Sequence, residues 1–271
     1  MRRLVLVAMM VGLWQGAHAA DLPVLRGFLD DAPRNVRTNW EGFYVGGQAG
    51  VGSSDMNFTN ATAPLVQKLL FATAIENEGG VSQWPVLGRV NNHGAGFGGF
   101  VGYNAQWDDV IIGIEANYLH GNFGGSDTGI MSRSFSTSNG YTNAVNYEAS
   151  AAVRIKDMGT VRIRAGYAWD VFMPYIFGAA AFGFGDISQT ARVFGTQVNA
   201  SAPPPFGVIP FDLSISNQAN DHLLYGYAGG AGLDVLLVGG LFARGEWEYV
   251  KFAGQANTSI NTVRAALGYK F

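Results

Sequence analysis

The stretch that decides the fold is residues 161–169, which read VRIRAGYAW. Its odd positions are apolar or aromatic, whereas Arg162 and Arg164 occupy even positions. Alternation with a period of two is typical of a β-strand whose two faces lie in different environments. The odd apolar face continues back through residues 147–155. We therefore predict one long strand over residues 147–169, with an apolar face and a charged face.

The same alternation recurs along most of the chain. It is found in six further segments, namely 43–51, 97–107, 112–118, 223–233, 241–249 and 263–271. Residues 174–187 also resemble a strand, but they mix small and aromatic side chains, so the sequence does not assign their faces. The count is eight if residues 147–169 are one strand that projects beyond the bilayer. A turn at residues 157–159 would give nine, and bacterial single-chain barrels have even strand numbers.

The composition argues against an ordinary soluble protein. The 271 residues are 48% hydrophobic and 14% charged, and 38 of them are Gly. A soluble domain has about 25% charged residues and about 7% Gly. Abundant aromatic residues argue against disorder. The formal net charge of −3 provides no basic patch, so we expect no nucleic-acid partner. The absence of Cys excludes a disulfide scaffold and thiolate metal sites.

Charged side chains sort to one face of these strands. Each lies opposite the apolar set of its own strand, and they are Glu115, Arg162, Arg164, Arg244, Glu246, Glu248 and Arg264. A charge on the lipid-facing side of a barrel strand costs up to about 2–4 kcal/mol, so the charged face is the interior. Among sheets, only a closed barrel satisfies all backbone groups in lipid. We predict an all-β, eight-stranded, antiparallel, up-and-down transmembrane β-barrel with a lumen-facing charge network.

The N-terminus has the pattern of a secretory signal peptide. Arg2 and Arg3 precede an apolar run over residues 4–14, and Ala17-His18-Ala19 supplies a small-residue cleavage site. So short an apolar run cannot span a bilayer, which needs about 20 residues. The expected segments are a signal peptide over residues 1–19, cleaved near Ala19 or Ala20, a periplasmic tether over residues 20–39, and a barrel in the cell outer membrane over residues 40–271.

The connections between the expected strands have different lengths. Residues 108–109, 170–171 and 239–240 are short connections, residues 54–93, 121–146 and 188–222 are long ones, and residues 253–261 are intermediate. Short barrel turns lie in the periplasm and long loops lie outside. We therefore expect long extracellular loops and both chain ends in the periplasm.

The first long loop contains an expected helix over residues 64–78. It begins at Pro64, has an apolar face that includes Val66 and Leu70, and is closed by Gly79-Gly80. A helix this short is marginal alone. Its apolar face could pack over the barrel mouth, lie on the membrane surface or dock a partner.

Two motifs suggest cofactor or metal binding. Residues 94–99 match the glycine spacing of a dinucleotide-binding loop, but a strand continues where that mechanism needs a helix. His93, His120 and His222 are expected at the extracellular rim, on strands that are not all neighbours, which argues against a shared metal or haem site. We expect no cofactor and no metal.

One set of residues comes near to a catalytic triad. It consists of His120, Ser126 and Asp127, a base, a nucleophile and an orienting acid. The glycines around them predict a loop too flexible to hold a catalytic geometry. We therefore do not expect an enzyme.

Four motifs resemble a known family. They are residues 20–23 (ADLP), 40–47 (WEGFYVGG), 159–168 (GTVRIRAGYA) and 263–271 (VRAALGYKF). They resemble the alphaproteobacterial outer-membrane surface-antigen and porin-like family, within the wider group similar to the transmembrane domain of outer-membrane protein A. The motifs span essentially the whole chain and mark the scaffold. The first loop and the loop with Pro203-Pro204-Pro205 depart from the family, so no ligand-binding residue is carried over.

The last strand adds a partner to this resemblance. A terminal aromatic residue with alternating residues before it resembles the signal read by the barrel-assembly machinery. The residues concerned are Val263, Ala265, Leu267, Tyr269 and Phe271. The resemblance implies that this machinery assembles the protein.

Together these observations predict a non-catalytic barrel with a structural or surface-binding role. Eight strands leave an interior that side chains can fill, and buried charges are tolerated chiefly when paired. The alternative is a narrow ion or small-solute channel with porin-like activity, and a lipid-modifying or proteolytic barrel comes third. The expected partners are outer-membrane lipid and lipopolysaccharide, the barrel-assembly machinery and an extracellular ligand bound by the loops.

Overall fold

The computed structural model describes residues 38–199, 201–202, 207–253 and 257–271. The expected signal peptide, most of the expected tether, Pro203-Pro204-Pro205 and part of the connection at residues 253–261 lie outside the described residues. The chain divides into residues 1–37 and 38–271. The barrel belongs to the second of these units.

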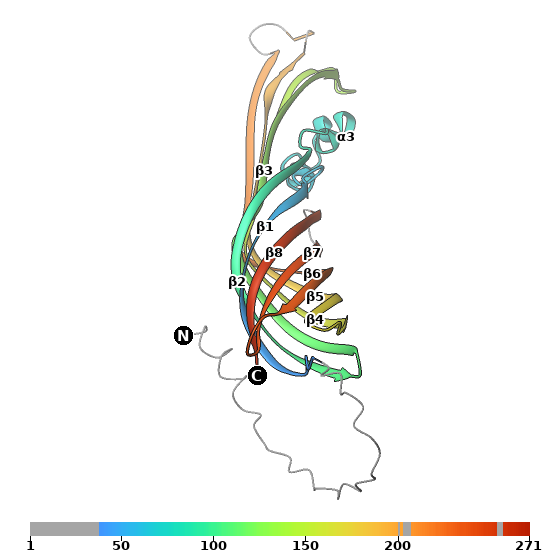
Figure 1. Ribbon diagram of the computed structural model, residues 1–271. Coiled ribbons are helices and arrows are strands. Elements are labelled where there is room, and N and C mark those ends of the chain that lie inside the picture. Colours follow the sequence, from blue (N-terminus) through green and yellow to red (C-terminus); the bar gives the residue numbers. More distant parts are fainter. Residues whose placement is uncertain (1–37, 200, 203–206, 254–256) are drawn as a thin grey trace, which may run out of the picture. The chain divides into compact units, whose positions relative to one another are not determined.

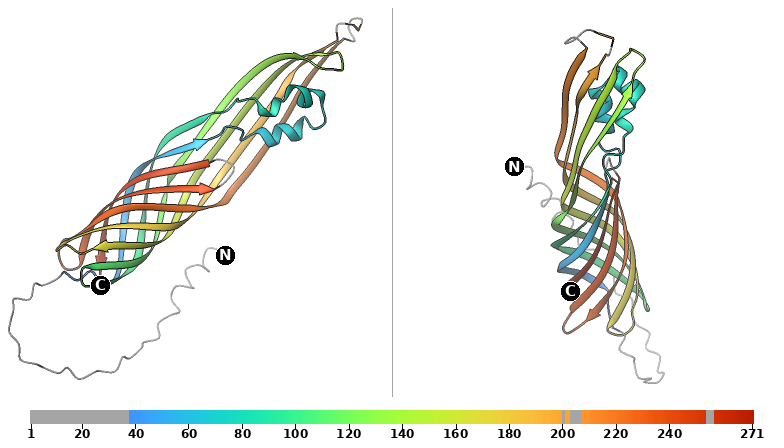
Figure 2. Two further views of the ribbon diagram at one scale, coloured as in Figure 1. Left: turned by 90° about the vertical axis from the view of Figure 1, so that its right-hand side faces the viewer. Right: turned by 90° about the horizontal axis from the view of Figure 1, so that it is seen from above.

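Eight antiparallel strands close into one barrel (Figure 1). Each strand pairs with its neighbours in sequence, and β1 pairs with β8 to close the ring (Figure 2). The strands are β1 (Gly42–Asn57), β2 (Arg89–Trp107), β3 (Val110–Ser136), β4 (Thr142–Tyr167), β5 (Phe172–Val198), β6 (Val208–Leu236), β7 (Leu241–Ala253) and β8 (Asn257–Lys270). The eight-stranded, up-and-down barrel predicted from the alternation is confirmed.

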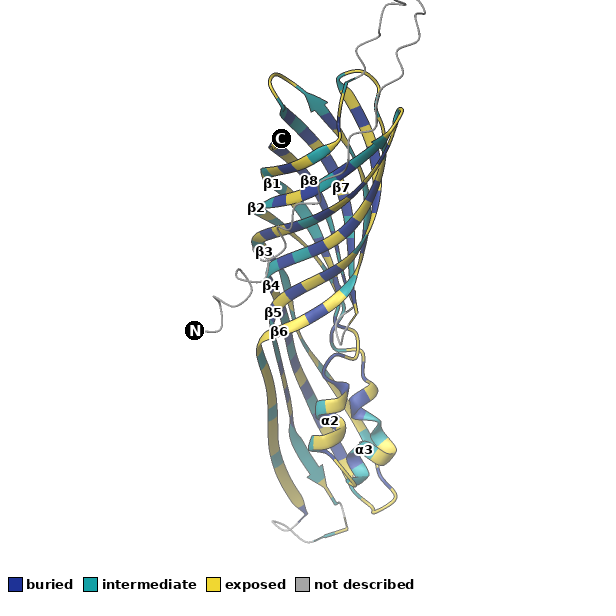
Figure 3. Ribbon diagram, turned by 90° about the horizontal axis from the view of Figure 1, so that it is seen from below, coloured by how far each residue is buried: buried dark blue, intermediate teal, exposed yellow. Residues whose placement is uncertain are grey.

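Buried and exposed residues alternate along the barrel strands (Figure 3). The outward face is apolar, with Phe43 64% exposed and Ile163 66% exposed. On β5, where the sequence left the faces unassigned, Tyr175 and Phe177 are buried inside and Ile176 is exposed outside. An apolar outward belt around a polar interior is the arrangement that a lipid bilayer requires of a barrel.

β4 runs without a turn through residues 157–159, as the even strand count required. It contains a bulge between Ile155 and Asp157. Further register shifts lie beside it, between His120 and Phe123 on β3 and between Gly185 and Ile187 on β5. Bulges bend strands, and this row of irregularities crosses four neighbouring strands at one level.

Four strands continue beyond this row as an open part of the same sheet. β2 pairs with β3 only as far as Gly96 and Gly121, and β7 pairs with β6 only as far as Ala253 and Tyr225. We call the continuing part of β3, β4, β5 and β6 the extension. It consists of residues 123–136, 142–155, 187–198 and 208–219.

Two of the expected long loops are wrong, because their residues form the extension. Residues 121–146 and 188–222 are mostly strand, and only a short turn at residues 137–141 separates β3 from β4. The outward face of these segments carries polar residues such as Ser126, Thr128 and Ser188, so their sequence lacks the continuous apolar face of the other strand segments. The inward face keeps its apolar alternation, with Val145, Tyr147 and Ala149 all buried.

The first loop forms two helices where one was expected over residues 64–78. These are α2 (Ala63–Leu69) and α3 (Ala74–Gly79), followed by a 3-10 turn, η1 (Val81–Gln83). The chain breaks at Ala72, which has a positive φ of 59°. The Thr73 side chain then caps α3 by accepting a hydrogen bond from the backbone N–H of Glu76. α3 ends at Gly79 and is capped by Gly80, which has a positive φ of 54°, as the Gly79-Gly80 stop predicted.

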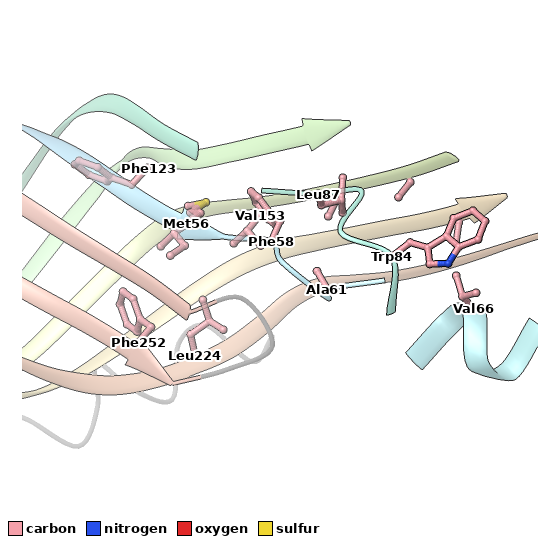
Figure 4. Close-up of a cluster of buried hydrophobic side chains, with 14 of the residues drawn as sticks. Met56, Phe58, Ala61, Val66, Trp84, Leu87, Phe123, Val153, Leu224 and Phe252 are labelled. Carbon is pink, nitrogen blue, oxygen red and sulfur yellow. The ribbon is translucent and has the colours of Figure 1, made fainter. Parts of the chain in front are cut away.

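The apolar face of this first loop is covered by the extension (Figure 4). Val66, Leu70 and Trp84 are buried in one cluster with Tyr147 and Val193 of the sheet. The hydroxyl oxygens of Thr62 and Tyr147 lie 2.6 Å apart. Local packing is therefore the outcome among the three that the sequence left open. No helix in the described part of the chain is long and apolar enough to cross a membrane.

Candidate functional site

All seven charged residues expected in the lumen lie together in it. With Asp234 they form what we call the charged belt, four arginines and four carboxylates whose residues are 1–3% exposed. The formal charges of the eight side chains cancel. Burying a charge without a partner is very costly, so this equality is the first condition for a stable interior.

Neighbouring strands supply one set of ion pairs in the belt. The sheet register places Glu115 directly opposite Arg162, Asp234 opposite Arg244, and Glu246 opposite Arg264. Arg162 Nε donates to Glu115 Oε1 at 2.9 Å, and Arg244 Nε donates to Asp234 Oδ1 at 2.7 Å. These pairs follow directly from strand pairing.

Other ion pairs cross the lumen. Arg164 on β4 reaches Asp234 on β6, with Nη2 2.7 Å from Oδ2. Arg162 on β4 reaches Glu246 on β7 at 2.8 Å. Arg244 on β7 donates to Glu115 on β3 at 2.9 Å. The belt therefore joins strands from opposite walls of the barrel.

Aromatic side chains complete the belt. Tyr44 donates a hydrogen bond to Glu115 at 2.8 Å, and Tyr175 donates one to Glu246 at 2.6 Å. The Arg164 guanidinium lies 3.9 Å from the centroid of the Tyr175 ring, a cation–π contact. A Cβ at Gly232 would collide with this ring, so the absence of a side chain there makes room for Tyr175.

Apolar side chains fill the lumen on both sides of the belt. At the end with the short turns, a buried cluster includes Trp40, Phe100, Met173 and Phe242. On the side of the extension, a cavity of about 10 Å³ borders Arg264, which is room for about one water molecule. The apolar cluster shared with the extension follows. The described lumen is packed with side chains.

Three members of this site were not predicted from the sequence, namely Asp234, Tyr44 and Tyr175. Asp234 occupies an even position on the polar face of its strand, so the alternation in the sequence could have identified it as a lumen residue. The tyrosines gave no such signal, because an aromatic residue at an inward position is equally compatible with plain packing. Their hydrogen bonds to Glu115 and Glu246 depend on neighbours from other strands.

The structure places the three residues that came near to a triad in separate surroundings. His120 Nδ1 lies 2.7 Å from Oδ1 of Asp157, and Asp127 Oδ2 instead accepts a hydrogen bond from the backbone N–H of Gly88 at 2.7 Å. Ser126 and Asp127 lie on β3, so the flexible loop expected around them is wrong. His120 and Asp127 are therefore engaged with other partners than Ser126.

The cofactor and metal motifs also have structural explanations. Residues 94–99 lie within β2 and pair with β1, so no helix start follows the glycines. Among the described residues, no group of three or more His, Asp or Glu could hold a metal ion. His120 packs edge-on against Phe97, with ring centroids 5.6 Å apart.

A closed barrel with an apolar outward belt and a packed, ion-paired interior defines an integral β-barrel of the outer membrane. The chain belongs to the family described as outer membrane protein beta-barrel domain, which matches residues 6–271. The family and the outer-membrane location expected from the sequence motifs are thereby confirmed.

Individual relatives are distant. A 25 kDa outer-membrane immunogenic protein of Brucella ovis is 24% identical over 176 residues, which cover 64% of this chain and 62% of the relative. A 22 kDa outer membrane protein of Rhizobium leguminosarum is 24% identical over 250 residues, 89% of this chain and 82% of the relative. The solved structure of Ail, the attachment invasion locus protein of Yersinia pestis, matches 85% of this chain and 99% of that one with 13% identity and a TM-score of 0.31.

Proposed function

We propose that this protein is a non-conducting, non-catalytic outer-membrane anchor that presents its extension at the cell surface for binding. The observation that carries the proposal is the charged belt. Its eight side chains are buried and ion-paired, and the pairs Arg162–Glu246 and Arg244–Glu115 link strands on different sides of the barrel, so the barrel serves as an anchor and leaves no room for solute passage. The extension is then the part available for interaction.

The orientation follows from the difference between the two ends of the barrel, one closed by short turns and the other carrying the first loop and the extension. Short barrel turns face the periplasm and long connections face outward. The turns near Asp108, Asp170 and Gly239 lie at the end where Phe271 donates its backbone N–H to the carbonyl of Phe43 at 2.9 Å. We therefore place both ends of the barrel domain in the periplasm and the extension outside. The immunogenic description of the Brucella relative supports surface exposure.

Single-channel conductance tests the closed lumen. Refolded protein inserted in planar bilayers should give no conductance steps. The narrow-channel alternative predicts small, reproducible steps that Arg164→Ala or Glu246→Ala changes and that the matched surface variant Arg192→Ala leaves unchanged. Such steps in the unmodified protein would overturn the proposal.

Cysteine labelling tests the orientation, since the chain contains no Cys. Ser136→Cys places a thiol near the tip of the extension, and Val238→Cys places one in a short turn, where Val238 is 73% exposed. A membrane-impermeant maleimide added to intact cells should label only the Ser136→Cys variant. Labelling of the Val238→Cys variant alone would invert the proposed orientation.

A further inference from the structure

A polar groove lies on the outward face where the extension leaves the barrel. It has a volume of about 500 Å³, within the range of ligand pockets, and five strands contribute to its walls. The side chains that matter here are Asn122, Ser126, Arg154, Ser188, Gln218 and Asn220. None of them takes part in the charged belt or in the cluster under the first loop.

The sheet register aligns these side chains. Ser126, Ala152, Ser188 and Gln218 form one row across β3, β4, β5 and β6, because each pairs directly with the next. Arg154 lies one row nearer the barrel, opposite Gly124 and Asp186. The small residues Gly124, Ser126, Ala152 and Ser188 leave the groove open beside the longer side chains of Arg154 and Gln218.

Most of the polar side chains that line the groove have no protein partner, whereas Asn92 donates to the carbonyl of Gly124 and Asp186 is paired with Lys156. Within the described chain, the side chains of Asn122, Ser126, Ser188, Gln218 and Asn220 make no hydrogen bond, and Arg154 makes neither a hydrogen bond nor a salt bridge. In the lumen, by contrast, the carboxylates and guanidinium groups are paired. Free donors and acceptors that converge on a hollow are the features of a polar ligand site.

A fixed ion pair forms the wall beside Arg154. Lys156 Nζ lies 2.5 Å from Asp186 Oδ2, and the backbone N–H of Asp221 donates to Asp186 Oδ1 at 3.2 Å. The hydrogen bond from Lys156 holds the pKa of Asp186 below its usual range. Both carboxylate oxygens of Asp186 are thus already engaged. The charge of Arg154 acts on Asp186 from the neighbouring strand, but the guanidinium keeps its hydrogen-bond donors for a ligand anion.

The chemistry of these groups selects a class of ligand. An amide side chain has both donors and acceptors, and a hydroxyl has a donor and two acceptor lone pairs, so together they match the vicinal hydroxyls of a sugar. An unpaired guanidinium suits a carboxylate or a phosphate, which it binds through two parallel hydrogen bonds. We propose that this groove binds a short segment of an acidic saccharide.

This inference rests on the proposed function, because it needs the extension to lie outside the cell. The apolar outward face ends just below the groove, where Phe184 is 48% exposed and Tyr225 66% exposed. The groove therefore lies at the height of the lipid headgroups. Its ligand can come from lipopolysaccharide in the same leaflet or from a glycan of another cell, and both present acidic sugars.

Titration calorimetry on the refolded full chain tests the site with two probes. One is deacylated lipopolysaccharide core oligosaccharide, and the other is an oligomer of glucuronic acid. Saturable binding of only the first assigns the ligand to the leaflet, binding of only the second assigns it to an outside glycan, and binding of both supports the acidic-saccharide class. Binding of neither at millimolar concentration overturns the inference.

Variants connect the binding to the groove. Arg154→Gln should weaken Kd about tenfold or more, the effect of losing one charge-assisted contact, and Gln218→Ala should weaken it several-fold. Arg192→Gln is the matched control, since Arg192 lies on the same outward face but pairs with Asp212 at 2.6 Å. Equal binding by all three variants would overturn the inference. If Ser136→Cys is labelled on intact cells and no probe binds, the proposed function stands and the groove assignment fails.

Discussion

Arg164 and Asp234 lie on strands that are not neighbours, yet their side chains meet in the lumen with Nη2 2.7 Å from Oδ2. Asp234 also accepts two hydrogen bonds from Arg244, at 2.7 and 3.0 Å. One carboxylate thus joins β4, β6 and β7 through the centre of the barrel. The ion pairs in the lumen therefore connect strands across the barrel, whereas backbone hydrogen bonds connect only neighbouring strands around its circumference.

Removing this carboxylate should destabilise the barrel strongly. In the Asp234→Asn variant, Arg164 and Arg244 lose their shared anion in a buried site, and breaking a buried pair costs about 3–5 kcal/mol. Urea unfolding in lipid vesicles measures the change. The matched control is Asp212→Asn, because Asp212 is bonded to Arg192 but exposed, and exposed pairs contribute little. Equal unfolding midpoints for the two variants would contradict the bracing role.

The row of bulges should mark the membrane boundary. Ile163 and Ile130 are similarly exposed, 66% and 61%, but Ile163 lies in the barrel part of β4 and Ile130 in the extension of β3. Ile163→Arg should cost about 2–4 kcal/mol because it places a charge in lipid. Ile130→Arg should leave the unfolding free energy unchanged, since its environment is water. A large cost for Ile130→Arg would move the boundary into the extension.

The barrel could be predicted from the sequence because lipid places a strict requirement on the outward face of each strand. An outward residue such as Ile163 must be apolar, and a charged residue such as Arg162 must then face inward. Parity alone therefore placed all seven of the expected lumen charges. The individual arginine–carboxylate pairs could not be predicted from the sequence. Contacts such as that of Arg164 with Asp234 depend on the tilt of the strands and on the closure of the barrel.

Outside the bilayer, outward residues need not be apolar. The outward face of the extension carries residues such as Ser126, Thr128 and Ser188, which in a sequence look like a loop. The groove was missed for the same reason, since its side chains converge only after four strands align. The break at Ala72 was also hidden, because a positive φ at a residue that favours helices reflects packing of the whole first loop.

The first loop should depend on Trp84 for its position. Trp84 is 5% exposed, packs edge-on against Phe135, lies under Arg133 at 5.0 Å, and donates its indole N–H to the carbonyl of Gly79 at 3.0 Å. Trp84→Ala removes a buried aromatic ring, a loss of about 3–5 kcal/mol. Trypsin should then cleave after Lys68 much faster, while the barrel stays resistant. Phe71→Ala is the control because Phe71 is 82% exposed, and equally fast cleavage in both variants would argue against docking by Trp84.

The last residue should matter for assembly more than for stability. The ring of Phe271 is 73% exposed and contacts Tyr269 with centroids 5.2 Å apart, while the backbone N–H of Phe271 closes the barrel against Phe43. Phe271→Ala keeps that backbone bond, so refolding of the purified chain into lipid should be nearly unchanged. In cells, the assembled fraction should fall several-fold if the assembly machinery reads the terminal aromatic residue.

The control for this prediction is a second phenylalanine at the same end of the barrel. Phe43 is 64% exposed and contacts Tyr103 with ring centroids 4.8 Å apart, so Phe43→Ala removes a comparable ring from a strand at the other end of the chain. Heat-modifiable migration of membrane fractions measures assembly in both variants. A similar loss for Phe43→Ala and Phe271→Ala would mean that the ring matters for lipid contact, and that the terminal position carries no separate signal.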